Sequence, residues 1–456
     1  MTALGSDAFV FFGAGGELAY QRIFPALQAL SRRGRLAMPV VGVAKSGWDL
    51  NYFKARALAS LESHGGVDSA ASAKLLARLH YVDGDYADPA VYAQLRQALG
   101  NAARPCHYLA IPPGLFATVA DGLAKSGCAK GARIIVEKPF GRDLASAHLL
   151  NRTLHQRFPE SAIFRIDHFL SREAVENLLY FRFANAFLKP VWNRAHIASV
   201  QITLAERSGV AGRGHFYEEV GAIRDTVQNH LLQVVALLAM DVPAGHGPDA
   251  MRDEKLRVLR AMRPLCPAET VRGQFRGYRA ENGVAPDSQV ETFAALRLHI
   301  ETERWAGVPF YIRVGKRLPV TCSEALVKLK PVAHPLFDAI EPGQENYFRF
   351  RLAPDFVASL GARIKAPGEA MVGEAVELVA HRDPGDGMSA YERLLGDALR
   401  GNAAMFGRDD CVEAAWHVVE PILNGAVPLL EYPPDTWGPS AAGHILGGES
   451  GWHNPA

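Results

Sequence analysis

Short apolar runs alternate with amphipathic stretches over the first third of the chain. The runs predicted as strands are Phe9–Phe12, Val40–Ala44, Tyr108–Ile111, Ile134–Val136 and Ile163–Ile166. Helical patterns fill stretches between them: Leu18–Leu30, Pro89–Leu99, Phe116–Lys125 and Leu144–Leu154. Strands that alternate with helices predict right-handed βαβ units and a parallel sheet.

The rhythm changes after about residue 170. Period-two alternation predicts strands of a mostly antiparallel sheet at Val200–Leu204, Tyr347–Leu352 and Val376–Val379. Helices are predicted near Glu219–Met240, Ser389–Phe406 and Cys411–Leu423, and the closing segment Ser440–Ala456 is predicted to fray. With 456 residues and roughly 100–200 residues per domain, we predict an α/β domain at residues 1–170 and an α+β domain at residues 171–456.

Composition excludes several classes of partner. Lys and Arg total 49 and Asp and Glu total 48, for a net charge of +1, so bulk charge does not favour nucleic acid or anionic membrane. No apolar run reaches the ~18 residues of a membrane span, and the first residues do not resemble a signal peptide. Five widely spread cysteines favour reduced thiols over disulfides or a zinc site. We therefore expect a cytoplasmic protein without a metal.

A glycine-rich turn follows the first predicted strand and precedes a helix. Its residues are Gly13, Ala14, Gly15, Gly16, Glu17 and Leu18. Glycines let the backbone turn tightly and let a pyrophosphate approach, and the helix N-terminus offers N–H groups to the anion. The spacing is a variant of the dinucleotide fingerprint, and the alternative interpretation is an ordinary strand–helix turn.

The end of the second predicted strand bears on the choice of dinucleotide. A NAD site usually places Asp or Glu there for the ribose 2′-hydroxyl, whereas this strand ends in Lys45. Lys45 could face the 2′-phosphate of NADP, or it could be a solvated surface lysine. NADP is favoured and NAD stays open.

Two histidines stand in chemically suggestive places. Asp167 and His168 close a strand of the parallel type, where open α/β sheets bind ligands. His230 ends a polar block, Ala222–His230, on the otherwise apolar long helix, and such a block is costly to bury unless it lines a site. The alternative for each histidine is a hydrogen-bonded structural role.

With these motifs in order, the sequence resembles the glucose-6-phosphate dehydrogenase family over nearly its whole length. The matching segments are Gly13–Ala19, Tyr108–Pro113, Glu137–Leu144, Arg165–Leu170, Arg182–Asn185, Trp192–Arg194, Gly212–Gly214, Arg224–His230, Val271–Gln274, Pro309–Lys316, Ala390–Leu395 and Trp437–Pro439. The resemblance implies an N-terminal Rossmann domain and a C-terminal α+β domain with a large, mostly antiparallel sheet. It also implies oxidation at C1 of a hexose 6-phosphate, by default glucose 6-phosphate, to the 1,5-lactone, with hydride transfer to NADP or NAD. A homodimer or homotetramer is expected from the same resemblance.

The resemblance also assigns roles to residues. His230 would be the general base that takes the C1 hydroxyl proton, and Asp167 would orient and stabilise its charged form. Lys138 would bridge cofactor and sugar. The other expected substrate-binding residues are His168, Phe169, Arg172, Glu206, Asp225, Lys316 and Thr321. The expected cofactor-binding residues beyond the glycine turn are Arg22, Lys45, Tyr108 and Pro112.

Departures from the family pattern concern the substrate and coenzyme phosphates. Phe169 and Arg172 stand where the family has Tyr and Lys, and Thr321 replaces a second basic residue. Gly15 replaces a hydroxyl residue of the glycine turn. These changes leave open a C2-substituted sugar phosphate, such as an amino or acetamido hexose 6-phosphate, or an unphosphorylated sugar. A non-catalytic sensor of NADP or sugar phosphate is the alternative of another class, and the presence of Asp167 and His230 speaks against it.

Overall fold

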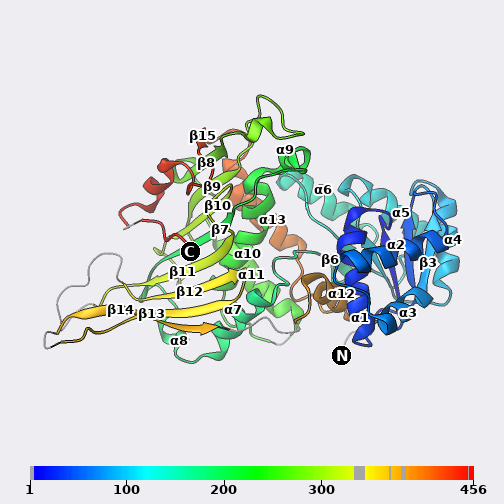
Figure 1. Ribbon diagram of the computed structural model, residues 1–456, viewed down its shortest axis with the longest axis horizontal. Coiled ribbons are helices and arrows are strands. Elements are labelled where there is room, and N and C mark those ends of the chain that lie inside the picture. Colours follow the sequence, from blue (N-terminus) through cyan, green and yellow to red (C-terminus); the bar gives the residue numbers. More distant parts are fainter. Residues whose placement is uncertain (1–4, 246, 333–344, 369–370, 382–386, 450) are drawn as a thin grey trace. The chain divides into compact units, whose positions relative to one another are not determined.

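The computed structural model describes residues 5–245, 247–332, 345–368, 371–381, 387–449 and 451–456 (Figure 1). The chain divides into two compact units. Unit 1 contains the chain up to Arg172 together with Ala244–Arg252 and Met388–Glu413, and unit 2 contains the rest. The two later segments of unit 1 lie outside the range 1–170 that the sequence suggests for the first domain.

Unit 1 is built on a six-stranded parallel sheet in the order β3-β2-β1-β4-β5-β6, so the prediction of a parallel sheet is confirmed. The strands are β1 (Ala8–Phe12), β2 (Val40–Ala44), β3 (Leu79–Asp83), β4 (Pro105–Leu109), β5 (Arg133–Val136) and β6 (Ile163–Arg165). Strand β3 was not predicted. It is an edge strand in which only Leu79 and Val82 are buried, and this leaves a weak apolar signal.

Helices cover both faces of this sheet. Alternate residues of β1 enter two apolar clusters, one with α1, α2, α3 and α12 and the other with α4, α5 and α6. The helical segments are η1 (Ala19–Ile23), α1 (Phe24–Arg32), α2 (Leu50–Ser63), α3 (Ser69–Arg78), α4 (Pro89–Leu99), η2 (Pro113–Leu115), α5 (Phe116–Lys125), α6 (Leu144–His155), η3 (Glu160–Ala162) and α12 (Ala390–Arg400). Helix α12 arrives from late in the chain and completes the cluster around α1.

Unit 2 is built on a nine-stranded sheet in the order β14-β13-β12-β11-β7-β10-β9-β8-β15. Its strands are β7 (Ile197–Glu206), β8 (Thr270–Phe275), β9 (Phe293–Leu298), β10 (Phe310–Lys316), β11 (Cys322–Leu329), β12 (Tyr347–Ala353), β13 (Val357–Lys365), β14 (Gly373–His381) and β15 (Leu429–Tyr432). Neighbours are antiparallel except for β7 with β10 and β8 with β15. The prediction of a mostly antiparallel sheet is confirmed.

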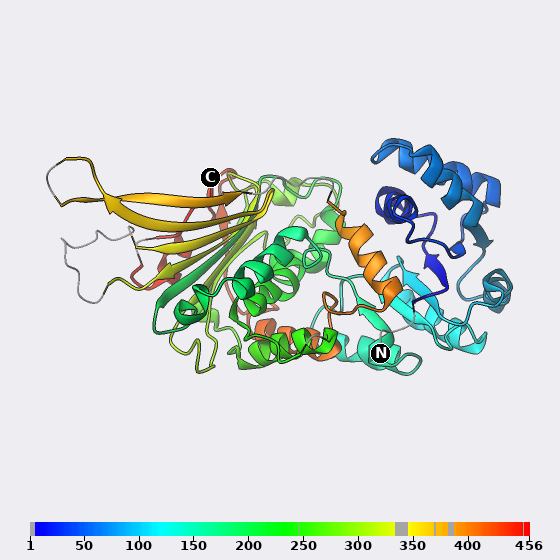
Figure 2. The ribbon, with the colours of Figure 1, turned by 90° about the horizontal axis from the view of Figure 1, so that it is seen from below.

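One face of the large sheet carries helices, as Figure 2 shows for the green segments α7 (Glu173–Ala184) and α10 (Leu232–Ala239). Phe181 of α7 meets Phe350 of β12 with ring centroids 5.4 Å apart. The helical segments after Arg172 and outside α12 are α7 (Glu173–Ala184), α8 (Leu188–Val191), α9 (Gly214–Ala222), η4 (Ile223–Leu231), α10 (Leu232–Ala239), α11 (Pro248–Ala261), η5 (Pro267–Glu269), η6 (Tyr278–Ala280), α13 (Asp409–Val419), η7 (Glu420–Ile422) and η8 (Ser440–Leu446). Within the described residues, none of the helices has the length and apolarity needed to cross a membrane.

The helix predicted near Glu219–Met240 is divided into three parts. Gly221 has φ 65° and kinks the end of α9, and η4 then follows as a π-helix before α10. A Cβ at Gly221 would lie 2.5 Å from Glu291 Oε1. Glu291 Oε1 accepts from the Ile223 N–H at 3.0 Å, which fixes the start of η4. The polar block of the sequence therefore occupies a π-helical segment, a conformation that is frequent at functional sites.

The prediction that the closing segment frays is wrong. The Trp452 indole N–H donates to the Ala442 carbonyl at 2.9 Å, and His453 Nε2 lies 2.7 Å from Glu324 Oε1. The Arg313 guanidinium lies against the rings of Trp437 and Trp452, 4.3 and 4.8 Å from their centroids. Aromatic contacts and hydrogen bonds hold a segment whose composition is small and polar.

Candidate functional site

The glycine turn lies at the carboxyl end of β1 and presents backbone. Gly13 has φ +82°, and a Cβ there would lie 2.1 Å from the Ala110 carbonyl oxygen. The Gly16 N–H donates to the Gly13 carbonyl at 2.9 Å and closes the turn. Glu17 and Leu18 then lead into the π-helical segment η1. Because this close turn admits no side chain at Gly13 and opens a helix, it fits the pyrophosphate of a dinucleotide.

The carboxyl ends of β2 and β3 form a second part of this edge. Lys45 Nζ lies 2.8 Å from Asp85 Oδ2, and this hydrogen bond raises the pKa of Lys45. Asp83 Oδ1 accepts from the N–H groups of Ser46 and Gly47 at 3.0 and 2.8 Å. Burial works against ionisation of Asp83, but these donors outweigh it and lower its pKa. Lys45 is thus already engaged by a carboxylate.

Sequence reasoning missed Asp83 and Asp85. The signal was present, because parallel strands end at the same edge of a sheet and both residues follow the Tyr81-Val82 part of β3. Recognising it required β3 to be recognised first.

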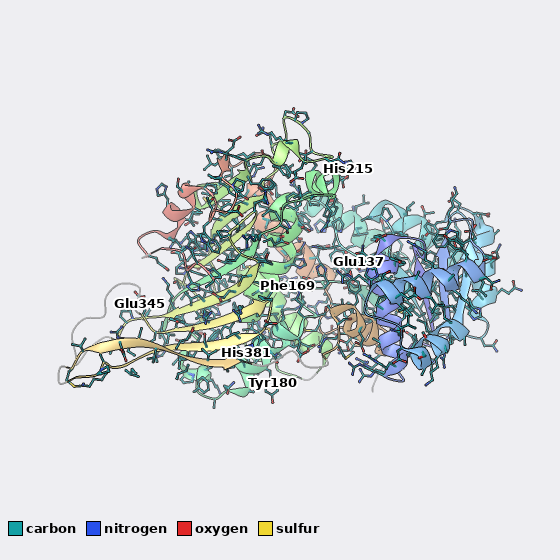
Figure 3. All side chains as sticks on the ribbon, viewed as in Figure 1. Glu137, Phe169, Tyr180, His215, Glu345 and His381 are labelled. Carbon is teal, nitrogen blue, oxygen red and sulfur yellow. The ribbon has the colours of Figure 1, made fainter. Side chains whose placement is uncertain are left out.

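Tyr108 lies in the core of unit 1 and not on an exposed path. It is fully buried, and its hydroxyl donates to Glu137 Oε1. The Tyr391 hydroxyl lies 3.4 Å from the same oxygen. Burial raises the pKa of Tyr391, and the charge of Arg22 opposes this rise. Burial raises the pKa of Glu137, against the opposing effects of Tyr108 and the Lys138 charge. Tyr108 thus contacts Glu137 (Figure 3), which directly precedes Lys138.

Pro112 and Lys138 follow neighbouring parallel strands. Pro112 is exposed and comes three residues after β4, and Lys138 is half-buried and comes two residues after β5. Both therefore lie at the same edge of the sheet as the glycine turn, since all these strands are parallel.

Asp167–Arg172 forms a tight turn after β6. Asp167 is buried, and its Oδ1 accepts from the Phe169 N–H at 2.9 Å. The Phe169 ring (Figure 3) is buried, and the exposed Arg172 guanidinium lies 4.9 Å from its centroid. Together with the half-buried His168, Arg172 presents cationic chemistry suited to an anion.

A second group of predicted residues gathers in unit 2. Glu206 and Lys316 face each other across the parallel β7–β10 pair and form an ion pair. Lys316 Nζ lies 5.5 Å from the ring centroid of Tyr217. Thr321 Oγ1 accepts from the Arg207 N–H at 3.1 Å, so it lies beside the end of β7.

Asp225 and His230 lie on η4 in the same unit. Burial raises the pKa of Tyr217, and the charges of Asp225, Glu291 and Glu206 add to this. His230 is buried, and its backbone N–H donates to Asn229 Oδ1 at 2.6 Å. Tyr217 was missed by sequence reasoning, because an aromatic residue on a helix is usually a core residue. The predicted set thus falls into two groups, each within one unit.

One trio in unit 1 has metal-ligating chemistry. His155, Glu160 and Asp409 bring ligand atoms within 4.8 Å of one another. Arg165 donates to Glu160 at 2.7 Å, and His155 Nε2 lies 3.0 Å from Glu160 and 3.5 Å from Asp409, so both carboxylates already contact protein side chains.

Comparisons with known proteins cover both units. The family model described as glucose-6-phosphate dehydrogenase, NAD binding domain, matches residues 10–177. The model described as glucose-6-phosphate dehydrogenase, C-terminal domain, matches residues 179–453.

Individual relatives match over nearly their full length. The chain is 40% identical over 466 residues to glucose-6-phosphate 1-dehydrogenase 1 of Mycobacterium tuberculosis, covering 99% of this chain and 97% of the relative. A crystal structure of glucose-6-phosphate 1-dehydrogenase from Mycobacterium avium has a TM-score of 0.93 at 40% identity and 99% coverage of both chains. A glucose-6-phosphate dehydrogenase in complex with its substrate glucose-6-phosphate has a TM-score of 0.92 at 33% identity and 100% coverage of both. Because both family models and these relatives match along nearly the whole chain, and the strand ends carry the geometry described above, the chain belongs to the glucose-6-phosphate dehydrogenase family.

Proposed function

We propose that this protein oxidises C1 of glucose 6-phosphate to the 1,5-lactone and transfers the hydride to NAD(P)+. The observation that carries the proposal is the likeness, at 33% identity and over the whole chain, to a dehydrogenase described in complex with glucose-6-phosphate. Asp167, His230 and Lys138 are all present, which supports a working enzyme over a non-catalytic sensor.

His230 is the proposed general base. An imidazole has a ring nitrogen that can take the C1 hydroxyl proton and release it again. Asp167 is the proposed carboxylate that stabilises the protonated imidazole. The bound coenzyme supplies the hydride acceptor, and the protein's own residues handle the proton and the sugar.

The remaining residues are proposed to bind the phosphate of the substrate by charge and its sugar hydroxyls by hydrogen bonds. His168 and Arg172 are proposed to bind the phosphate, with Phe169 supporting Arg172. Glu206 and Asp225 are proposed to accept from sugar hydroxyls, with Lys316 held in place by Glu206. Lys138 is proposed to bridge sugar and coenzyme. The glycine turn, Pro112 and Arg22 are proposed to line the coenzyme, with Tyr108 acting through Glu137.

The proposal extends to the domains, the assembly and the cellular compartment. Residues 1–170 would hold the coenzyme, and residues 171–456 would hold the sugar and form a homodimer or homotetramer. The cytoplasm is the proposed compartment, supported by the five free cysteines, of which Cys106, Cys128, Cys322 and Cys411 are buried. Sedimentation of the purified chain tests the assembly.

A substrate panel tests the proposed function. Glucose, glucose 6-phosphate, glucosamine 6-phosphate and N-acetylglucosamine 6-phosphate are compared by kcat/KM with the purified enzyme. We expect glucose 6-phosphate to be oxidised fastest. A clear preference for an amino or acetamido sugar would instead support the C2-substituted alternative that Thr321 leaves open.

The His230→Asn variant tests the mechanism. Loss of the general base is expected to lower kcat by about 10²–10⁴-fold, while the affinity for glucose 6-phosphate, measured by calorimetry, changes only a few-fold. Unchanged turnover would contradict the assignment of His230. If the wild-type protein bound glucose 6-phosphate but showed no turnover, the result would favour a non-catalytic sensor.

A further inference from the structure

The backbone of Lys316 is fixed at the end of β10. Its N–H donates to the Thr292 carbonyl at 2.9 Å, and its own carbonyl accepts from the Tyr432 hydroxyl at 2.6 Å. The Leu318 N–H donates to the Glu206 carbonyl at 3.1 Å. The end of β10 is therefore tied to its neighbours, and the long side chain of Lys316 is the part that still needs to be positioned.

The Lys316 ammonium has one charged partner. Its side chain is 13% exposed and forms an ion pair with Glu206 across the β7–β10 pair. An ammonium carries three N–H donors on a flexible stem, so a single carboxylate fixes only one of its directions. Glu206 is also proposed to accept from a sugar hydroxyl. A second contact that needs no acceptor atom would hold the ammonium and leave its other donors available.

The ring of Tyr217 supplies such a contact. Tyr217 lies on α9, and Lys316 Nζ is 5.5 Å from its ring centroid. An aromatic face attracts a cation within about 6 Å of its centroid, and the attraction is stronger where water is excluded. Tyr217 is 4% exposed, so little water reaches its ring.

The Tyr217 ring is itself held in place. It packs edge-to-face against Tyr278 with ring centroids 6.2 Å apart, and both residues belong to an apolar cluster with Phe275 and Phe293. The Tyr278 hydroxyl donates to Glu218 Oε1 at 2.7 Å. The ring is therefore a rigid surface for the ammonium of Lys316.

The hydroxyl of Tyr217 stays neutral. Burial raises its pKa well above the ordinary value, and the charges of Asp225, Glu291 and Glu206 add to this rise. The contact with Lys316 is therefore made by the aromatic face and not by a phenolate. Asp225 and Glu206 are both proposed to bind sugar hydroxyls, so Tyr217 borders the proposed sugar site.

From these contacts we infer that Tyr217 is a positioning residue of the sugar site. Its ring and Glu206 together hold the Lys316 ammonium, and the remaining N–H donors are available to oxygen atoms of the substrate. Only the identity of that substrate, glucose 6-phosphate, rests on the proposed function, since the contact between ring and ammonium exists without it. Loss of the ring should weaken substrate binding through Lys316 and leave the chemical step at His230 nearly unchanged.

The first test compares Tyr217→Leu with Tyr217→Phe in the full-length protein. Leucine has no aromatic face, whereas phenylalanine keeps the face and lacks only the hydroxyl. We expect Tyr217→Leu to raise both the KM for glucose 6-phosphate and its calorimetric Kd by about five- to tenfold, with kcat within about threefold. Tyr217→Phe should stay within about twofold of the wild type. In a Lys316→Gln background, Tyr217→Leu should add less than about twofold, because the ammonium is already absent.

Phe275→Leu is the matched control. It removes a ring from the same apolar cluster, where Phe275 meets Tyr278 with ring centroids 5.5 Å apart. We expect it to lower the midpoint of thermal unfolding as Tyr217→Leu does, while the KM for glucose 6-phosphate changes by less than about twofold. A rise in KM equal to that of Tyr217→Leu would show that any loss of packing in the cluster damages the site, and would overturn the inference.

A second measurement needs no substrate. Reductive methylation with a ¹³C label keeps the charge of lysine, and the NMR signal of Lys316 is the one absent from Lys316→Arg. An aromatic face shifts nearby methyl signals upfield. The Lys316 signal should therefore move downfield in Tyr217→Leu and stay in place in Tyr217→Phe.

Other outcomes would also overturn the inference. They are an unchanged KM in Tyr217→Leu, equal impairment by the leucine and phenylalanine variants, a full effect in the Lys316→Gln background, or a Lys316 methyl signal that Tyr217→Leu does not move. If the wild-type protein neither bound nor oxidised glucose 6-phosphate, the proposed function would fail, while the methyl signal would still decide whether the ring holds Lys316.

Discussion

Phe169 and Arg172 differ together from their counterparts in the family pattern, and their contact gives a reason. The guanidinium of Arg172 lies over the face of the buried Phe169 ring. An aromatic face attracts a planar cation, so the Phe169 ring positions a guanidinium where the family pattern has a tyrosine hydroxyl and a lysine ammonium. The exchange keeps a cation at the proposed phosphate site while changing how that cation is held.

Arg172→Gln should therefore affect binding and not the chemical step. We expect the KM for glucose 6-phosphate to rise by about 10–100-fold, because a charged hydrogen bond to phosphate is lost, with kcat within threefold. Steady-state kinetics measures both. Glucose is the control, since its oxidation should not respond, and an equal loss with glucose would contradict a phosphate role.

His107 predicts a pH dependence of stability. Burial lowers its pKa to about 4, and its Nε2 lies 2.9 Å from the Cys128 carbonyl. The unfolded chain takes up this proton near pH 6.5, so between these values the unfolded state binds more protons and stability falls as pH falls. The loss from pH 7 to 4 should be about 3 kcal/mol.

The loss is measured by unfolding the protein in urea at each pH and monitoring hydrogen exchange of the β4 amides, which reports on unit 1. His107→Gln keeps a side-chain donor without the titration, so its pH dependence over the same range should be smaller. An equal dependence in the variant would show that other groups are responsible.

At the scale of elements, the division of the long helix into α9, η4 and α10 puts His230 in the π-helical segment η4. Gly221 and Glu291 come from distant parts of the sequence, and together they end α9 and start η4. Glu291 also pairs with Arg272 at 2.9 Å. The start of the π-helical segment is therefore fixed by Glu291, which also forms a buried ion pair with Arg272 of β8.

Gly221→Ala should damage both stability and activity. The new Cβ would collide with Glu291 in a left-handed backbone conformation, and we expect a loss of about 2–4 kcal/mol and at least a tenfold fall in kcat. Thermal unfolding and steady-state kinetics measure these. Gly443→Ala, where a Cβ meets open space, is the matched control and should behave as wild type.

Predictability from sequence differs among elements for physical reasons. Central strands such as β1 can be predicted because a buried strand is a continuous apolar run in the sequence. Asp167 and His168 can be predicted as a strand-end pair because they directly follow such a run. The edge strand β3 is half exposed, so it was missed together with Asp83. The π-helical segment depends on Glu291, about 70 residues away from it, and no local pattern encodes that contact.

At the scale of the whole molecule, the last residues close unit 2. Glu324 is buried and contacts His453, and Arg313, whose pKa burial lowers to about 9, lies between two tryptophans. Each group takes one hydrogen-bond partner from the last residues, while Glu324 also pairs with Arg349 at 3.2 Å and Arg313 also lies over Trp437.

A chain that ends at Glu449 should therefore be less stable. We expect a loss of about 1–3 kcal/mol, because Glu324 and Arg313 each lose one hydrogen-bond partner, measured as a lower midpoint of thermal unfolding. His453→Gln alone removes one contact and should cost less. A truncated chain as stable as the wild type would contradict a structural role for the terminus.

The late arrival of α12 in unit 1 also bears on how the protein is made. Leu394, Leu395, Ala398 and Leu399 of α12 belong to the same apolar cluster as Phe24 and Leu27 of α1. On the ribosome, α1 emerges more than 360 residues before α12. The nascent chain must therefore leave part of the apolar face of α1 uncovered through most of its synthesis, and such a surface is the kind that chaperones protect from aggregation.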